Sequence, residues 1–128
     1  MSNVLGVGID LVSISEIHDL DERLNRNFVR QTFTDRELKD ADSALDYYQF
    51  LAGRFAVKEA VYKAICGNYP EINFDFRNVE TIRISNGAPR FNGNENVLKI
   101  LSQIGASDIK ISISNQGDLV TAIAELIK

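Results

Sequence analysis

The segment from Val4 to Val12 constrains the fold of this chain more than any other part of its sequence. Its residues alternate in character. One face is apolar and consists of Leu5, Val7, Ile9 and Leu11, and the other consists of Gly6, Gly8 and Asp10. A period of two residues indicates a β-strand with one face on a core. We predict a strand with an apolar core face and a nearly bare opposite face, where the two glycines leave room for a close approach.

Two capping-box patterns predict where helices begin. Ser13 is followed three residues later by Glu16, and Thr34 by Glu37. From the first cap, apolar residues recur at helical spacing as far as Phe28, which predicts one helix over that stretch. A third helix is predicted over QFLAGRFAVKEAVYKAIC, residues 49–66, and it stops at Gly67.

The second half of the chain predicts mainly strands. A strand over 79–85 leads into the Asn86-Gly87 turn and a second short strand. A short helix from Asn94 to Gly105 and two further alternating segments, 109–114 and 119–127, complete the pattern. Helices early and strands late indicate an α+β fold with helices packed on a mostly antiparallel sheet. The length of 128 residues predicts one domain, residues 1–128.

Charge and composition exclude several classes of protein. Fourteen Lys and Arg against eighteen Asp and Glu give a net charge of −4, which argues against a nucleic-acid binder. No apolar run approaches the ~18 residues that a membrane span needs, and the N-terminus has no signal-peptide pattern. The single cysteine, Cys66, allows no internal disulfide and favours a reducing compartment, so we predict a cytoplasmic protein. The single histidine, His18, excludes a multi-histidine metal site.

Asp10 is the first residue whose position suggests chemistry. A carboxylate in an otherwise apolar strand costs free energy unless it has a partner. It either has a functional role or caps the helix that follows, and Ser13 competes for the capping role.

The helix over 49–66 carries an unusual pattern of charges. Arg54 and Lys58 lie four residues apart, a spacing at which like charges repel, and an anion held between them would relieve the repulsion. Glu59 and Lys63 have the same spacing and form either an ordinary surface ion pair or part of a site. In the second case Glu59 and the strand residue Asp10 share one Mg²⁺, which typically takes one or two carboxylates plus substrate phosphates.

Arg23, Arg26 and Arg30 lie on one face of the first predicted helix. An acidic residue precedes each of the first two by four positions, which favours a solvated and self-paired face. The alternative is a docking stripe for an acidic partner.

Five segments together resemble a known family. GIDLVSISEI, FTDREL, FLAGRFAVKEAVYKAI, NGAP and ISISN occur in this order and cover nearly the whole chain. They are similar to the holo-acyl-carrier-protein synthase family of 4′-phosphopantetheinyl transferases, and the FLAGRFAVKEA block is the most specific of them. The resemblance implies Mg²⁺-dependent transfer of phosphopantetheine from coenzyme A to a serine of an apo acyl or peptidyl carrier protein, a step of fatty acid biosynthesis that releases 3′,5′-ADP.

The resemblance also implies roles for particular residues. Asp10 and Glu59 match the family's Mg²⁺ ligands, and with Lys63, near the reacting phosphate, they form the expected catalytic set. The positions expected to contact coenzyme A are Arg54, Lys58, Lys63, Pro89 and Asn115. The base that accepts the serine proton is either Glu59 or a metal-bound water. The family further implies a homotrimer with sites at the subunit boundaries, with no nucleic-acid or membrane partner.

The chain departs from the family pattern at four places. Asn115 stands where the family has a histidine, Glu16 replaces an arginine of the carrier-docking helix, and Gln31 stands where arginine is common. The segment Asp40 to Asp46, basic in several relatives, is acidic here. The positions that match the family's metal and phosphate ligands are kept, whereas the positions that match its carrier-binding and nucleotide-binding surfaces are altered. A second interpretation is therefore a catalytically idle relative that binds coenzyme A or a carrier protein.

Overall fold

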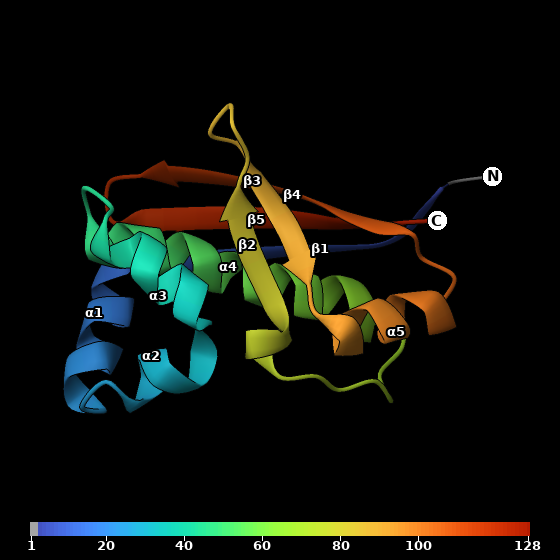
Figure 1. Cartoon of the computed structure of the whole chain (residues 1–128), viewed down its shortest axis with the longest axis horizontal. Helices are drawn as coiled ribbons and strands as arrows, with labels where there is room; N and C mark the ends of the chain where they lie inside the picture. The colour runs from blue at the N-terminus through green and yellow to red at the C-terminus, as the bar shows by residue number, and fades with distance from the viewer. Residues whose placement is uncertain (1–2) are drawn as a thin grey trace.

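The structure, a computed structural model that describes residues 3–128, has the predicted α+β architecture (Figure 1). The strands are β1 (Val4–Ser13), β2 (Val79–Arg83), β3 (Pro89–Gly93), β4 (Asp108–Gln116) and β5 (Leu119–Ile127). The helices are α1 (Ile14–Arg23), α2 (Asn27–Thr32), α3 (Asp35–Asp42), α4 (Tyr47–Cys66) and α5 (Glu95–Gln103), with a 3₁₀ turn η1 (Phe76–Asn78).

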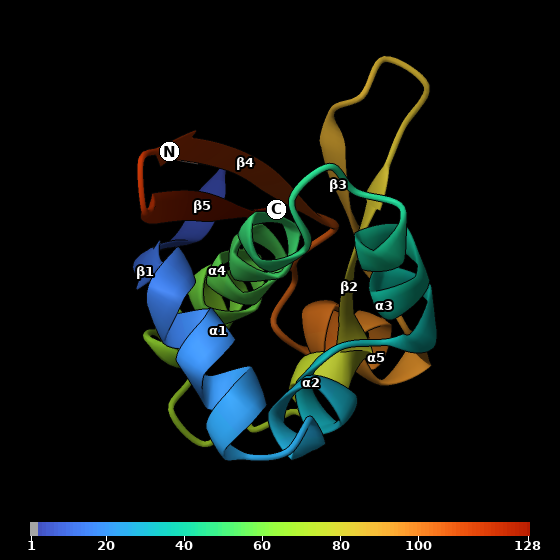
Figure 2. The ribbon, with the colours of Figure 1, turned by 90° about the vertical axis from the view of Figure 1, so that its left-hand side faces the viewer.

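The strands form two antiparallel units. The larger sheet has the order β1-β5-β4, so β5 is central and β1 and β4 are the two edges. The smaller unit is the β2–β3 hairpin, whose connecting loop extends away from the rest of the molecule (Figure 2). Gly87 in that loop has a φ of +87°, a conformation that glycine adopts without steric cost. The prediction of a mostly antiparallel sheet is confirmed.

Helix α4 lies against one face of the larger sheet (Figure 2) and supplies much of the core. Its N-terminal half packs on β4 and β5, where Gly53 faces Ile113 and Val120. Its C-terminal half packs on β1 at very short range. A Cβ atom on Gly6 would lie 2.2 Å from the carbonyl oxygen of Ala64. The glycine face of β1 is therefore the face that meets the core.

The predicted orientation of β1 is wrong. The apolar strip, which we define as Val7, Ile9 and Leu11, is 54%, 62% and 64% exposed and does not pack in the core. Figure 2 shows no helix of residues 3–128 over that face of the sheet. The alternation identified the strand correctly, but the glycine face is the buried one. At Gly6 and Gly8 the backbone of helix α4 lies too close to β1 for a Cβ atom to fit.

The first predicted helix is divided in two. The chain leaves α1 after Arg23, and Asn25 and Arg26 both have positive φ, which ends the helical path before α2 begins. Phe28 therefore lies on a different helix from Leu20.

The two predicted N-caps are confirmed: the Ser13 hydroxyl accepts from the Glu16 N–H, and the Thr34 hydroxyl accepts from the Glu37 N–H. No helix within residues 3–128 combines the length and apolar character needed to cross a membrane.

Candidate active site

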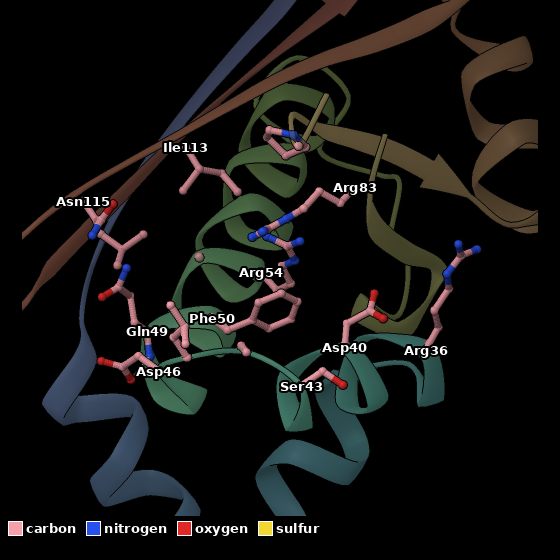
Figure 3. A pocket seen from close by; sticks show the side chains of 16 residues that line it. Arg36, Asp40, Ser43, Asp46, Gln49, Phe50, Arg54, Arg83, Ile113 and Asn115 are labelled. Carbon is pink, nitrogen blue, oxygen red and sulfur yellow. Dashed lines mark hydrogen bonds between the residues drawn. The ribbon is translucent and has the colours of Figure 1, made fainter. Parts of the chain in front are cut away.

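A pocket of about 880 Å³ opens between α3, the first half of α4, the β2–β3 hairpin and the end of β4 (Figure 3). Arginines from three of these elements reach it, namely Arg36 on α3, Arg54 on α4 and Arg83 on β2. Pro89 and Asn115, both predicted to contact coenzyme A, also line the pocket. The fold thus gathers three cationic groups around one cavity although the chain as a whole is acidic.

Arg54 is the most unusual residue of the pocket. Its side chain is nearly enclosed, and its guanidinium lies 4.1 Å from the centre of the Phe50 ring. Its Nε and Nη2 atoms are buried and have no hydrogen-bond partner among residues 3–128. Burial, followed by repulsion from Arg83, lowers the pKa of Arg54 to about 10. Buried N–H groups without acceptors are costly, so Arg54 could take its missing acceptors from a bound anion.

Two acidic residues stand at the rim of the same pocket. Asp46 is the N-cap of α4 and accepts from the Gln49 N–H at 3.0 Å. Asp40 lies on α3, and its carboxylate raises the pKa of Arg54 by attraction. Figure 3 shows Asp40 between Arg36 and Phe50 at the edge of the cavity. A ligand anion at Arg54 therefore competes with this carboxylate.

A second cluster lies on β1 and the second half of α4. The Nζ of Lys63 lies 3.2 Å from Oδ1 of Asp10 and donates to the Ile9 carbonyl oxygen at 3.0 Å. Glu59 is half-buried one turn before Lys63. Burial and then repulsion from Asp10 raise the pKa of Glu59, while Lys63 acts in the opposite direction. Two carboxylates and one ammonium therefore share a small region at the edge of the sheet.

This cluster fits a Mg²⁺ site completed by a ligand. Among the residues that the structure describes, no three His, Cys, Asp or Glu side chains are grouped for metal binding. A pair of carboxylates is nevertheless what Mg²⁺ commonly takes from a protein when phosphates supply further oxygens. The mutual repulsion of Asp10 and Glu59 is the kind of strain that a bound cation removes.

The capping alternative for Asp10 is not supported. Helix α1 begins with the Ser13 cap, and Asp118 in the β4–β5 turn accepts from the Ser15 N–H at 3.0 Å. Asp118 also accepts from the hydroxyls of Ser13 and Ser15. The start of α1 is thus satisfied without Asp10.

The two clusters lie at opposite edges of the larger sheet. Asp10 is on edge strand β1, whereas Asn115 is on edge strand β4, with β5 between them. Neither Asp10 nor Glu59 nor Lys63 lines the arginine pocket. Within one chain, the predicted site residues therefore form two groups.

Lys58 is not placed in either group. It is fully buried, and its Nζ lies 2.7 Å from Oε1 of Glu37, which is equally buried. The hypothesis that Arg54 and Lys58 hold one anion between them is not supported by this geometry. The two residues lie one turn apart, but Arg54 faces the pocket while Lys58 is neutralised inside the protein.

The row of arginines is also interrupted. Arg26 lies in the turn between α1 and α2, where it donates to the Tyr47 hydroxyl at 2.8 Å and approaches Asp21. Arg23 and Arg30 are exposed on two different helices. The prediction of a continuous face on one helix is wrong because the chain turns at Asn25.

The sequence pattern did not identify Arg36, Phe50 and Arg83 as pocket residues. Arg83 lies three residues before the Asn86-Gly87 turn, which marks it as hairpin but not as facing α4. The sequence offered one indication for Phe50: it lies one turn before Arg54 on the same helix, so the two side chains share a face.

Comparison with known proteins gives the site its context. Residues 6–124 match the family model of the 4′-phosphopantetheinyl transferase superfamily. A holo-acyl-carrier-protein synthase from Shewanella amazonensis is 33% identical, and the match covers 97% of this chain and 98% of that protein. The crystal structure of a holo-acyl-carrier-protein synthase from Neisseria meningitidis superimposes with a TM-score of 0.89 at 31% identity, over 98% of this chain and 99% of that one.

A second solved structure contains the coenzyme. The coenzyme A complex of the Chronobacterium ammoniagenes synthase superimposes with a TM-score of 0.81 at 27% identity, over 95% of this chain and 96% of that one. Each match extends over nearly the full length of this chain and of the protein compared, and it is found in the fold as well as in the sequence. This chain belongs to the 4′-phosphopantetheinyl transferase superfamily.

Proposed function

We propose that this chain is a holo-carrier-protein synthase that transfers 4′-phosphopantetheine from coenzyme A to a serine of an apo acyl or peptidyl carrier protein. The serine oxygen attacks the phosphorus on the pantetheine side of the diphosphate. A new P–O bond forms to serine, the P–O bond to the 5′-phosphate breaks, and 3′,5′-ADP leaves. The serine proton passes to a base.

The observation that carries this proposal is the burial of the Arg54 guanidinium without enough hydrogen-bond acceptors. Its buried Nε and Nη2 atoms, which have no hydrogen-bond partner in the part of the chain that the structure describes, lie beside Arg83 in a pocket large enough for a nucleotide. A phosphate of coenzyme A would supply the missing acceptors, and hydrogen bonds between guanidinium and phosphate are among the strongest in proteins. Pro89 and Asn115 would contact the same ligand along the pocket wall.

The Asp10 cluster would act on the diphosphate. Asp10 and Glu59 would hold Mg²⁺, and the bound ion supplies neutralisation of the phosphate charge. Lys63 is half-exposed and is oriented by Asp10 and the Ile9 carbonyl oxygen, and its ammonium would stabilise charge on the leaving group. The carrier protein brings the nucleophile, so this chain needs to supply only positioning and charge.

We further propose that the chain forms a homotrimer with each site at a subunit boundary. The apolar strip on β1 is exposed, and large exposed apolar patches mark interaction sites. The arginine pocket and the Asp10 cluster occupy opposite edges of the sheet. A neighbouring copy that placed its pocket edge against β1 would bring both groups to one ligand. We also propose a cytoplasmic location, which the single free cysteine favours.

The test is incubation with apo carrier proteins, coenzyme A and Mg²⁺. We expect the carrier mass to rise by one phosphopantetheine group and 3′,5′-ADP to be released. Chelation of the metal, Asp10→Ala and Glu59→Ala should each abolish the transfer. A chain that binds coenzyme A in calorimetry yet modifies no carrier from its own organism would support the idle interpretation, which the asparagine at 115 favours.

A further inference from the structure

Glu37 and Lys58 form a fully enclosed ion pair that none of the proposed chemistry uses. Their charged groups are 2.7 Å apart and neither side chain is exposed. Lys58 also donates to the carbonyl oxygens of Phe76, at 2.8 Å, and Val79. The pair therefore lies at the centre of a small buried network.

Glu37 completes the network on the other side. Its Oε1 accepts from the Thr34 N–H at 3.0 Å, which closes the capping box of α3. Its Oε2 accepts from the Thr81 N–H of β2 at 3.1 Å. One carboxylate and one ammonium thus connect α3, α4, η1 and β2 by hydrogen bonds.

These elements are the ones that carry the arginines of the pocket. Arg36 is the neighbour of Glu37 on α3, and Arg54 precedes Lys58 by one turn of α4. Arg83 lies two residues after Thr81 on β2, so the two side chains leave the strand on the same side. The buried network therefore joins the three elements that carry these cationic groups, together with a hydrogen bond of 2.7 Å from the Thr34 hydroxyl to Glu80 on β2.

Stability alone does not explain the pair. Burying two charges costs desolvation that their attraction often only balances, and apolar residues of similar volume commonly serve as well. Burial lowers the pKa of Lys58, which shows that the site disfavours the charged ammonium even though Glu37 attracts it. Directional hydrogen bonds to four backbone groups supply what an apolar pair cannot, a fixed geometry between the elements.

We propose that Glu37 and Lys58 are positioning residues for the arginine pocket: they set the spacing of Arg36, Arg54 and Arg83 for the phosphates of coenzyme A without contacting them. This inference rests on the proposed function and changes the role of Lys58 from a direct coenzyme ligand to a support behind the pocket. Like-charged guanidiniums move apart unless they are held, and a small misplacement of binding groups is costly to the reaction.

The test is the double variant Glu37→Leu/Lys58→Met, which replaces the pair by apolar side chains of similar size. We expect it to fold, because no charge is left unpaired, but with lower stability, because four backbone groups lose their hydrogen-bond partners. Its affinity for 3′,5′-ADP, measured by calorimetry, should fall about tenfold or more, the loss of one charge-assisted hydrogen bond. The KM for coenzyme A should rise in step, while kcat at saturating coenzyme A stays near that of the unaltered protein.

A matched control is available between two of the same elements. Asp35 on α3 and Arg77 on η1 form an ion pair at 3.4 Å, and the Asp35 side chain is fully exposed. Asp35→Asn should leave the affinity for 3′,5′-ADP and the KM unchanged. If the double variant does not fold, Glu37→Gln/Lys58→Met also leaves no charge unpaired and keeps one acceptor oxygen for the Thr34 or Thr81 N–H, and it should give a smaller loss of the same kind.

The outcomes separate this inference from the proposed function. Folded variants that bind 3′,5′-ADP as tightly as the unaltered protein overturn the positioning role. A loss of kcat with unchanged affinity also overturns it, because the pair would then act on the neighbouring Glu59. An unaltered protein that binds 3′,5′-ADP but transfers nothing contradicts the proposed function only, and absence of binding by the unaltered protein contradicts both.

Discussion

The backbone of Gly8 lies against the backbone of Ala60 so closely that a Cβ atom on the glycine would be 1.8 Å from the Ala60 carbonyl oxygen. The neighbour is helix backbone, which cannot rotate away as a side chain does. The contact fixes the distance between β1 and the second half of α4. Asp10 and Glu59 lie just beyond it on the same two elements, so the spacing of these carboxylates depends on this glycine.

Gly8→Ala should therefore destabilise the protein strongly. The helix has to move away from the strand, and overpacking of this kind costs about 3 kcal/mol or more. Unfolding in urea, followed by circular dichroism, measures the loss. Gly53→Ala is the matched control on the other half of α4, because its Cβ would meet Ile113 at an ordinary 3.6 Å. Alanine is the better helix former by about 1 kcal/mol, so this variant should be at least as stable as the original. Equal effects of the two substitutions would contradict the backbone contact.

The β1 segment also shows how far the sequence determines the fold. Period-two alternation identified the strand, and the glycines indicated a close approach, but the buried face was assigned wrongly. Apolar residues normally mark the core face, and here they mark a surface of the isolated chain. A monomer's sequence does not distinguish an apolar face that packs inside from one that packs on another copy, because both obey the same hydrophobic pattern.

The site shows the same limit. Motif spacing made Asp10, Arg54 and Glu59 candidates for the site, since each belongs to a local pattern on one element. Whether a lysine points into a cavity or inward depends on the partner that another element brings to it. The capping box of Thr34 and Glu37 is predicted and confirmed. The bond from the Thr81 N–H to the second oxygen of Glu37 and the ion pair with Lys58 arise only when α3 packs on α4 and β2.

Removal of Asp40 should strengthen coenzyme binding. Its carboxylate attracts Arg54 at the edge of the pocket and competes with the ligand's phosphate. Asp40→Asn should tighten 3′,5′-ADP binding about threefold, the size of a partly exposed charge interaction. Asp42→Asn is the control, since Asp42 belongs to the same helix and is exposed outside the pocket. Calorimetry at low ionic strength gives both affinities, and an equal effect of the two variants would point to net charge alone.

Replacing Arg54 should separate stability from binding. The pKa of Arg54 in the folded protein is about 10, below its ordinary value of 12.5. At any pH below about 10, the charged guanidinium therefore destabilises the ligand-free fold. Between about pH 10 and 12.5 the folded protein has lost this proton while the unfolded chain still holds it, so the free energy of unfolding rises with pH. Arg54→Met should raise the free energy of unfolding at pH 7 by about 1 kcal/mol and eliminate measurable 3′,5′-ADP binding. Thermal unfolding with and without ligand tests both statements, and a less stable variant would show that Arg54 has partners in solution.

A charge in the apolar strip should prevent assembly. Ile9 is the middle residue of the strip, and an unpaired lysine buried there at an interface costs several kcal/mol by the usual desolvation argument. We expect the unaltered protein to sediment as the proposed trimer and Ile9→Lys to sediment as a monomer. Leu98→Lys on α5 is the control, because Leu98 is 54% exposed, as Val7 is, but lies elsewhere on the molecule. Dissociation by both variants would indicate a general effect of added charge.

Mixing two inactive variants should restore activity if each site is shared between copies. Asp10→Ala lacks a carboxylate at one edge of the sheet, and Arg54→Met lacks the pocket arginine at the other. Each variant alone should transfer no phosphopantetheine. In a mixed trimer, a boundary is complete when its carboxylates come from an Arg54→Met copy and its arginine comes from an Asp10→Ala copy. Random assembly of equal amounts of the two variants makes about a quarter of the boundaries complete. Co-expression or joint refolding followed by the carrier mass assay should therefore recover about a quarter of the original rate. Sites contained within single chains predict no recovery at all, because every chain in the mixture has lost one of the two groups.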